Sequence, residues 1–170
     1  MTGDPVAAVS VVEDFDAFYR REFRAMVALA ASVGGGAAAE DLAQEAMVRA
    51  HRNWNRVGGY DNPGTWVRRV TINLATSTAR RRAAELRAKM RLRSRAQPVL
   101  AAPDPVHDPV WAAVAQLPPQ QRAAIALHYL EDRSVADIAE ILECSPSTAR
   151  VHLHKGRTRL AQVLEGATDD

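Results

Sequence analysis

Hydrophobic positions along the chain follow helical spacing almost throughout, and no segment alternates in the way typical of a β-strand. Between residues 13 and 33, apolar side chains recur every three or four positions, which predicts an amphipathic helix that three glycines, Gly34 to Gly36, bring to an end. A second helix is expected over 38–54, a loop over 55–63 and a third helix over 63–93. The expected buried side of the second helix comprises Leu42, Ala43, Met47, Ala50 and Trp54, and that of the third helix starts with Trp66, Val70 and Leu74.

Proline then interrupts the pattern. Four prolines fall within residues 94–109, and this composition predicts an extended linker. After it, apolar spacing predicts helices over 110–117, 119–130, 135–142 and 146–164. The expected fold is therefore all-α, with two small helical domains joined by a Pro-rich linker. The predicted boundaries are an N-terminal tail (1–12), a first domain (13–95), a linker (96–109), a second domain (110–165) and a C-terminal tail (166–170).

Residues 134–160 have the layout of a helix-turn-helix. Ser145 suits the cap of the second helix and Pro146 its first position. Projected at 100° per residue, Ala149, Leu153 and Gly156 share an inward face with Leu160, and polar residues lie opposite. The candidate contacts with double-stranded DNA are Ser147, Thr148, Arg150, Val151, His154 and Lys155. From periodicity alone, a solvated amphipathic helix in a bundle remains an open alternative.

Charge is strongly segregated along the chain, although the net charge is only +2. The net charge is −5 over residues 1–48, +11 over 49–95 and −5 over 96–149, which indicates different partners for different faces. The basic run over 80–95 either binds nucleic acid or forms a helix face exposed to solvent. Near the start of the third helix, aromatic, amide and guanidinium groups could stack on and hydrogen-bond unpaired bases: Tyr60, Asn62, Trp66, Arg68, Arg69 and Asn73. Core packing is the favoured interpretation of Trp54 and Trp66, and the two interpretations are balanced for Tyr60.

Composition excludes several classes of protein. The one cysteine, Cys144, rules out an intrachain disulfide and a four-cysteine zinc site, and it is expected to be a small buried apolar residue. No catalytic constellation, metal site or cofactor site is expected, because no phosphate-binding loop or histidine–carboxylate cluster is present. No apolar run approaches the ~18 residues of a membrane span and no secretory signal is evident. A cytoplasmic chain without membrane insertion is therefore expected.

Four stretches carry a family resemblance: FDAFYRREF (15–23), AEDLAQEAMVRAHRNW (39–54), TWVRRVTINLA (65–75) and the segment 117–160. In this order and spacing, the chain resembles an extracytoplasmic-function (ECF) sigma factor of bacterial RNA polymerase, of the sigma-70 superfamily. The resemblance implies a region 2 helical bundle followed by a region 4 helix-turn-helix. It also implies a promoter-specificity subunit with no enzymatic activity of its own.

The resemblance assigns roles to matched positions. The face that docks on the β′ clamp of core RNA polymerase is matched by Asp41, Gln44 and Glu45. For the acidic residues, stabilisation of the helix dipole is the alternative role. Region 4 is expected to bind the β flap. Loop 55–62 and the basic third helix match the element that binds and opens the −10 element around a flipped base. Residues 150–155 fall where similar proteins bind the −35 element. An anti-sigma factor is a further expected partner.

The chain departs from the family pattern at two places that bear on how promoter DNA would be recognised and opened. Of Arg150, Val151 and His152, only the first is basic, where the family often has a Lys/Arg-Ser-Arg run. The Gly-rich loop lacks the aromatic cluster of housekeeping sigma factors, so dependence on a well-matched promoter is expected. The alternative function is a stand-alone helix-turn-helix regulator with an N-terminal helical dimerisation or sensor domain.

Overall fold

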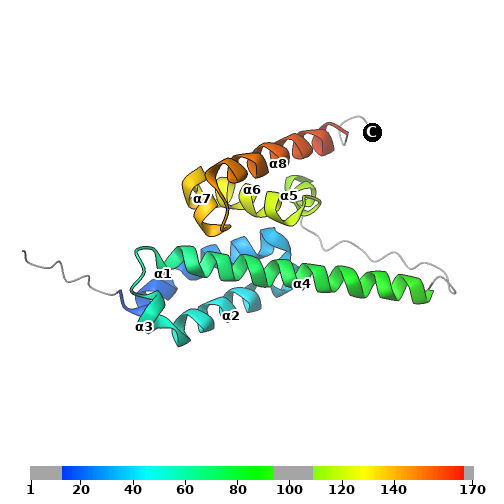
Figure 1. Cartoon of the computed structure of the whole chain (residues 1–170). Helices are drawn as coiled ribbons and strands as arrows, with labels where there is room; N and C mark the ends of the chain where they lie inside the picture. The colour runs from blue at the N-terminus through cyan, green and yellow to red at the C-terminus, as the bar shows by residue number, and fades with distance from the viewer. Residues whose placement is uncertain (1–12, 94–108, 167–170) are drawn as a thin grey trace, which may run out of the picture.

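The computed structural model describes residues 13–93 and 109–166, and every regular element in these ranges is helical (Figure 1). The first range contains α1 (Phe15–Ala30), the π-helical turn η1 (Ala31–Gly35), the 3₁₀ turn η2 (Gly36–Ala38), α2 (Ala39–Arg52), α3 (Trp54–Val57) and α4 (Pro63–Arg93). The second range contains α5 (Pro109–Ala115), α6 (Pro119–Glu131), α7 (Val135–Ile141) and α8 (Pro146–Gly166). The predicted all-α fold is confirmed.

The predicted linker and both predicted tails lie outside the described residues, except that Pro109 begins α5 and Gly166 ends α8. Among the helices of the two described ranges, none has the length and apolar character that a membrane crossing requires.

In the N-terminal half, α1, α2 and α4 pack around a core that includes Phe18, Met26, Met47 and Val67. The Trp54 ring lies with its centroid 4.9 Å from that of Phe18, and its indole N–H donates to the carbonyl of Glu13 over 3.1 Å. A half-buried indole that packs on the core and has a satisfied N–H is a structural side chain. The core interpretation is therefore confirmed for Trp54.

The glycines after α1 form the turn that the sequence predicts. Gly34 adopts a φ of 122°, a conformation that side chains other than glycine rarely take. A Cβ atom at this position would also lie only 2.9 Å from the Cβ of Ala79. The turn thus requires glycine both for its backbone conformation and for its close approach to α4.

Two expectations about the N-terminal half were wrong in detail. The predicted loop over 55–63 begins later, because Trp54–Val57 forms α3 and places Val57 in a fully buried position. The fully buried side of α4 is not the predicted stripe, whose members are only half-buried, but Val67, Thr71, Ile72 and Ala75. The reason is that α4 is covered from two sides, by α1 and α2 on one and by the C-terminal half on the other.

The C-terminal half contains the predicted helix-turn-helix. The backbone N–H of Thr148 donates to the Ser145 hydroxyl over 3.1 Å, so Ser145 caps α8 as expected. A reciprocal capping box between Ser134 and Asp137 starts α7, and these hydrogen bonds lower the pKa of Asp137. Ala149 and Leu153 of α8 are buried, and Gly156 allows α8 to approach Ile125 of α6.

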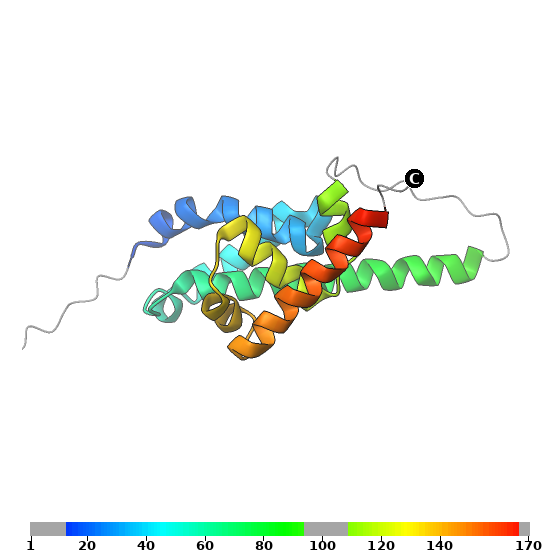
Figure 2. The ribbon, with the colours of Figure 1, turned by 90° about the horizontal axis from the view of Figure 1, so that it is seen from above.

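The two halves pack directly against each other. One buried cluster joins Leu29, Val33 and Ile72 of the N-terminal half to residues of α5, α6, α7 and α8. Figures 1 and 2 show the C-terminal half lying across α1 and α4, while the distal end of α4 projects beyond every other helix. The sequence predicts two domains but gives no indication of this shared core.

Candidate nucleic-acid and polymerase interfaces

A pocket of about 420 Å³ opens where the loop after α3 meets the start of α4. Four residues predicted to bind the −10 element line it, namely Tyr60, Asn62, Trp66 and Arg69. The remaining lining residues are Gly59, Asp61, Thr65 and, from α7, Glu140. Arg68 and Asn73, which were predicted for the same function, do not line the pocket. The structure therefore brings together most of the predicted set and adds an acidic residue from the other half of the chain.

The pocket walls combine aromatic and polar groups. Tyr60 is 41% exposed, whereas Trp66 is half-buried against the N-terminal core. The amide oxygen of Asn62 accepts a hydrogen bond from the backbone N–H of Thr65 over 3.2 Å and so caps α4 ahead of Pro63. Tyr60 is thus open to a ligand, while Trp66 and Asn62 also hold the local structure in place.

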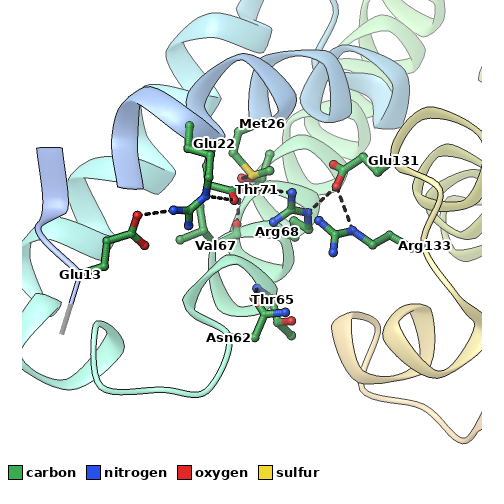
Figure 3. A network of polar contacts seen from close by, with 11 residues as sticks. Glu13, Glu22, Met26, Asn62, Thr65, Val67, Arg68, Thr71, Glu131 and Arg133 are labelled. Carbon is green, nitrogen blue, oxygen red and sulfur yellow. Dashed lines mark hydrogen bonds and ion pairs between the residues drawn. The ribbon is translucent and has the colours of Figure 1, made fainter. Parts of the chain in front are cut away.

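Arg68 is buried in an ion-pair network that links the two halves (Figure 3). Its guanidinium donates to Glu22 of α1 over 2.7 Å and to Glu131 of α6 over 2.5 Å, and only 4% of its side chain is exposed. Arg133 also contacts Glu131, at 3.3 Å. In this arrangement the Arg68 side chain cannot reach DNA, so its predicted contact with the −10 element requires the halves to separate.

Glu22 shows how strongly this network favours its charged form. Burial acts to raise the pKa of Glu22, but the charge of Arg68 and the hydrogen bonds from Arg21 and Arg68 outweigh it and hold the pKa below its ordinary value. The contribution of Glu22 to stability is therefore present at neutral pH and is lost as the pH falls through this lowered pKa.

Arg69 binds the end of α7. Its guanidinium donates to the carbonyls of Glu140 (2.8 Å) and Ile141 (3.2 Å), and it pairs with the Glu143 carboxylate at 3.0 Å. The last carbonyls of a helix have no partner within the helix and carry partial negative charge, so a guanidinium is a suitable cap. A residue predicted for DNA contact thus caps a helix of the other half.

Arg122 of α6 makes a third polar connection. It donates to the carbonyl of Val33 in η1 over 3.0 Å, and also to the carbonyls of Ala115 and Leu117 beside α5. Burial lowers the pKa of Arg122, yet a guanidinium stays protonated at neutral pH. Three carbonyls therefore hold a partly buried positive charge where the halves meet.

The predicted polymerase-binding residues lie on α2. Asp41 and Gln44 are exposed, and Glu45 is partly exposed and paired with Arg49 at 2.8 Å. The Gln44 side chain also accepts a hydrogen bond from the Tyr19 hydroxyl over 2.9 Å. Figure 1 shows α2 on the side of the N-terminal half that faces away from α6, α7 and α8. This face stays accessible while the two halves are packed together.

The predicted face of α8 is also accessible. Ser147, Thr148, Arg150, Val151, His154 and Lys155 are all exposed. Ser147 and Thr148 form hydrogen bonds of 2.8 Å with the Ser145 hydroxyl, which orders the first turn of the helix. Cys144, in the turn before α8, is half-buried against the core rather than fully buried, and burial raises the pKa of its thiol.

Comparison with known proteins identifies the class to which this fold and these surfaces belong. Residues 18–85 match the model of Sigma-70 region 2, and residues 107–160 match that of Sigma-70 region 4. The chain is 32% identical to the RNA polymerase sigma factor CarQ of Myxococcus xanthus, over 88% of this chain and 87% of CarQ. The chain belongs to the sigma-70 family of RNA polymerase sigma factors, in its ECF group, a non-enzymatic family that serves transcription initiation.

Individual relatives support this assignment. The chain is 32% identical to the ECF sigma factor SigE of Mycolicibacterium smegmatis over 96% of its own length, and it spans 65% of the length of SigE. It is 27% identical to the ECF sigma factor SigW of Bacillus subtilis, over 95% of this chain and 91% of SigW.

Two solved structures share the fold. RpoE of Bartonella quintana, in complex with the anti-sigma factor NepR, superposes with a TM-score of 0.71 at 24% identity, over 91% of this chain and 98% of RpoE. CnrH, in complex with the cytosolic domain of CnrY, gives a TM-score of 0.64 at 21% identity, over 89% and 88% of the two chains.

Proposed function

We propose that this sigma factor binds core RNA polymerase through α2 and positions it on promoters by binding the −10 element with region 2 and the −35 element with region 4. The observation that carries the proposal is the pocket beside α4, in which four of the residues predicted for −10 binding meet. The region 2 match supports a sigma factor rather than the alternative of a stand-alone regulator with a dimerisation or sensor domain.

The chemistry of the pocket suits an unpaired base. Its volume of about 420 Å³ lies within the range of roughly 300–1,000 Å³ typical of small-molecule sites. Tyr60 and Trp66 offer aromatic surfaces for stacking, while Asp61 and Asn62 offer groups that can hydrogen-bond a base edge. Melted promoter DNA is the proposed ligand of this pocket.

Polymerase binding is proposed for the α2 face that comprises Asp41, Gln44 and Glu45. An acidic and polar face is repelled by DNA phosphates and suits a basic protein surface such as the β′ clamp. Region 4 would contact the β flap and place the exposed face of α8 in the major groove of the −35 duplex.

The packing of the two halves bears on how this function begins. Arg68 is buried and Arg69 is bound to α7, so these two residues can contact the −10 element only when region 4 moves away from α4, a movement that also takes Glu140 out of the pocket. We infer that core polymerase drives this separation. We also propose an anti-sigma factor that stabilises the packed arrangement, because RpoE and CnrH, which share the fold, were solved with such a partner or with the cytosolic domain of CnrY.

Reconstitution with core polymerase tests the proposal. The holoenzyme should select one promoter sequence from a randomised duplex library and initiate transcription on it. Asp41→Lys should weaken core binding at least several-fold, whereas Asp16→Lys, a charge reversal at an exposed position of α1, should not. Tyr60→Ala should lower initiation while leaving core affinity unchanged. A wild-type chain that binds no core polymerase or selects no promoter would overturn the proposal.

A further inference from the structure

The pocket at the start of α4 is a composite site while the two halves are packed together. Its aromatic residues, Tyr60 and Trp66, come from region 2. One of its two carboxylates, Asp61, also comes from region 2, but the other, Glu140, comes from α7 of region 4. Figure 1 shows α7 beside the start of α4, and Arg69 joins the two helices through the carbonyl of Glu140. The pocket has this composition only as long as region 4 covers α4.

The two carboxylates of the pocket carry negative charge that no neighbour compensates. Asp61 and Glu140 are exposed, and among the described residues neither side chain takes part in a hydrogen bond or an ion pair. Arg69, the cation among the described lining residues, is already bound by two carbonyls of α7 and by the Glu143 carboxylate. A recess lined by unpaired charge of one sign raises the local concentration of the opposite charge, so the packed chain attracts a cation here.

The other walls of the pocket indicate an organic cation. Tyr60 and Trp66 present aromatic rings, and a cation placed over such a ring is attracted by its negative face. A metal ion would need more ligands, because the described residues contain no cluster of three or more histidine, cysteine, aspartate or glutamate side chains that could hold one. The volume of about 420 Å³ leaves room for a ring system. An anionic ligand such as a nucleotide would meet two carboxylates and is disfavoured.

We propose that the packed chain binds a planar aromatic cation of the amidinium or guanidinium class in this pocket, and that the bound cation holds region 4 against region 2. The ring stacks on the aromatic walls, and its N–H groups donate to Asp61 and Glu140, because paired donors of this kind match a carboxylate. Glu140 leaves the pocket when region 4 moves away, so the ligand binds the packed state more tightly and stabilises it. One consequence rests on the proposed function, namely that the bound ligand excludes the unpaired base of the −10 element.

Four small molecules separate the contributions of charge and ring. Benzamidine is a planar aromatic cation, benzamide is a neutral molecule of nearly the same shape, benzoate is the matching anion, and guanidinium carries the charge without the ring. In an NMR titration of the free, isotope-labelled chain, benzamidine should bind about fivefold more tightly than benzamide or guanidinium, and benzoate should not bind.

Charge-matched variants test whether the ligand occupies the pocket. Asp61→Asn/Glu140→Gln removes both pocket carboxylates, and Asp16→Asn/Glu85→Gln removes the same two charges from exposed positions outside the pocket. The first variant should lose about fivefold in benzamidine affinity, and the second should match the wild type. Glu140→Gln alone should also weaken binding. Benzamidine should shift urea unfolding of the wild type, but not of the first variant, to higher concentration.

No binding of benzamidine, equal affinity for benzamidine and benzamide, or equal affinity in the two double variants would overturn the inference. Full affinity in Glu140→Gln alone would also overturn it, because the ligand would then bind region 2 without holding region 4. These measurements use the chain without polymerase, so their outcome does not depend on the proposed function. A wild-type chain that binds benzamidine but selects no promoter in the holoenzyme would refute the proposed function and, with it, only the exclusion of the −10 element.

Discussion

The two surfaces assigned to promoter DNA use similar residues but differ in what those residues contact. At the start of α4, Arg68 is buried between two carboxylates and Arg69 binds the end of α7. On α8, Arg150 and Lys155 are exposed to solvent. A basic helix is therefore available to DNA only if the rest of the fold leaves its cations unpaired.

The two surfaces also differ in the free energy needed to expose their cations to DNA, because only those at the start of α4 are buried or half-buried. The charges of the Arg68 network are removed from water and compensate one another, so the loss of one partner is costly. The cations of α8 remain hydrated and can exchange water for phosphate directly. The free chain is therefore expected to present its −35 surface at once and its −10 surface only after the halves separate.

Removal of Glu131 should have the largest effect on this comparison. Glu131→Ala leaves the buried Arg68 with Glu22 alone, and we expect the packed arrangement to lose about 3 kcal/mol. Small-angle X-ray scattering should show a larger radius of gyration, and urea unfolding should shift to lower concentration. Gln120→Ala, at an exposed position of α6, is the matched control. An unchanged radius and stability for Glu131→Ala would contradict the role of the network.

Gly34 lies where Arg122 of α6 reaches η1, and its substitution should be nearly as damaging. Gly34→Ala places a side chain at a φ of 122° and within 2.9 Å of both Ala79 and Arg122. The strain predicts a loss of about 1–3 kcal/mol in urea unfolding. Gly59→Ala should change little, because the nearest atom to its new Cβ would be 3.5 Å away. Equal losses at the two glycines would argue against a special requirement at Gly34.

A substitution at Arg150 tests the exposed face of α8 that is proposed to bind the −35 element. Arg150→Gln should weaken binding of a selected −35 duplex by the holoenzyme by about 1–3 kcal/mol and leave the compactness of the free chain unchanged. Arg159→Gln, on the opposite side of α8 by helical projection, should have little effect on duplex affinity. The surface is assigned incorrectly if fluorescence anisotropy shows the two variants to be equally impaired.

The smallest effect is expected at Glu143. This carboxylate is 66% exposed and pairs with Arg69, and exposed pairs contribute at most about 1 kcal/mol. Glu143→Gln should barely change urea unfolding or the radius of gyration. An effect as large as that of Glu131→Ala would mean that the Arg69 contacts, and not the buried Arg68 network, hold the halves together.

Local features of this fold were predictable from the sequence. The glycines after α1, the prolines that begin α4, α6 and α8, and the Ser145 cap each act within a few residues. Apolar spacing therefore placed most helices within a few residues of their observed bounds. The short helix α3 was missed because four residues are too few to show helical apolar spacing, and the burial of Val57 is a property of the folded chain.

Contacts between the halves were not predictable in the same way. Arg68 lies 46 residues from Glu22 and 63 residues from Glu131, and no motif links these positions. Glu140 enters the pocket from α7 for a similar reason. One available signal is the alternation of acidic and basic segments, which favours different external partners when the sequence is considered alone. Segments of opposite charge can also pair with each other, and here they do so in part.

The most direct test of the account measures the separation of the two halves. Fluorophores at Arg52→Cys on α2 and Gln162→Cys on α8, both exposed positions, report this distance in a Cys144→Ser chain. We expect one well-defined transfer efficiency in the free chain and a clear change when core polymerase is added. A broad spread of efficiencies in the free chain, or an efficiency that core polymerase leaves unchanged, would contradict the claim that region 4 packs against α4 until the polymerase binds.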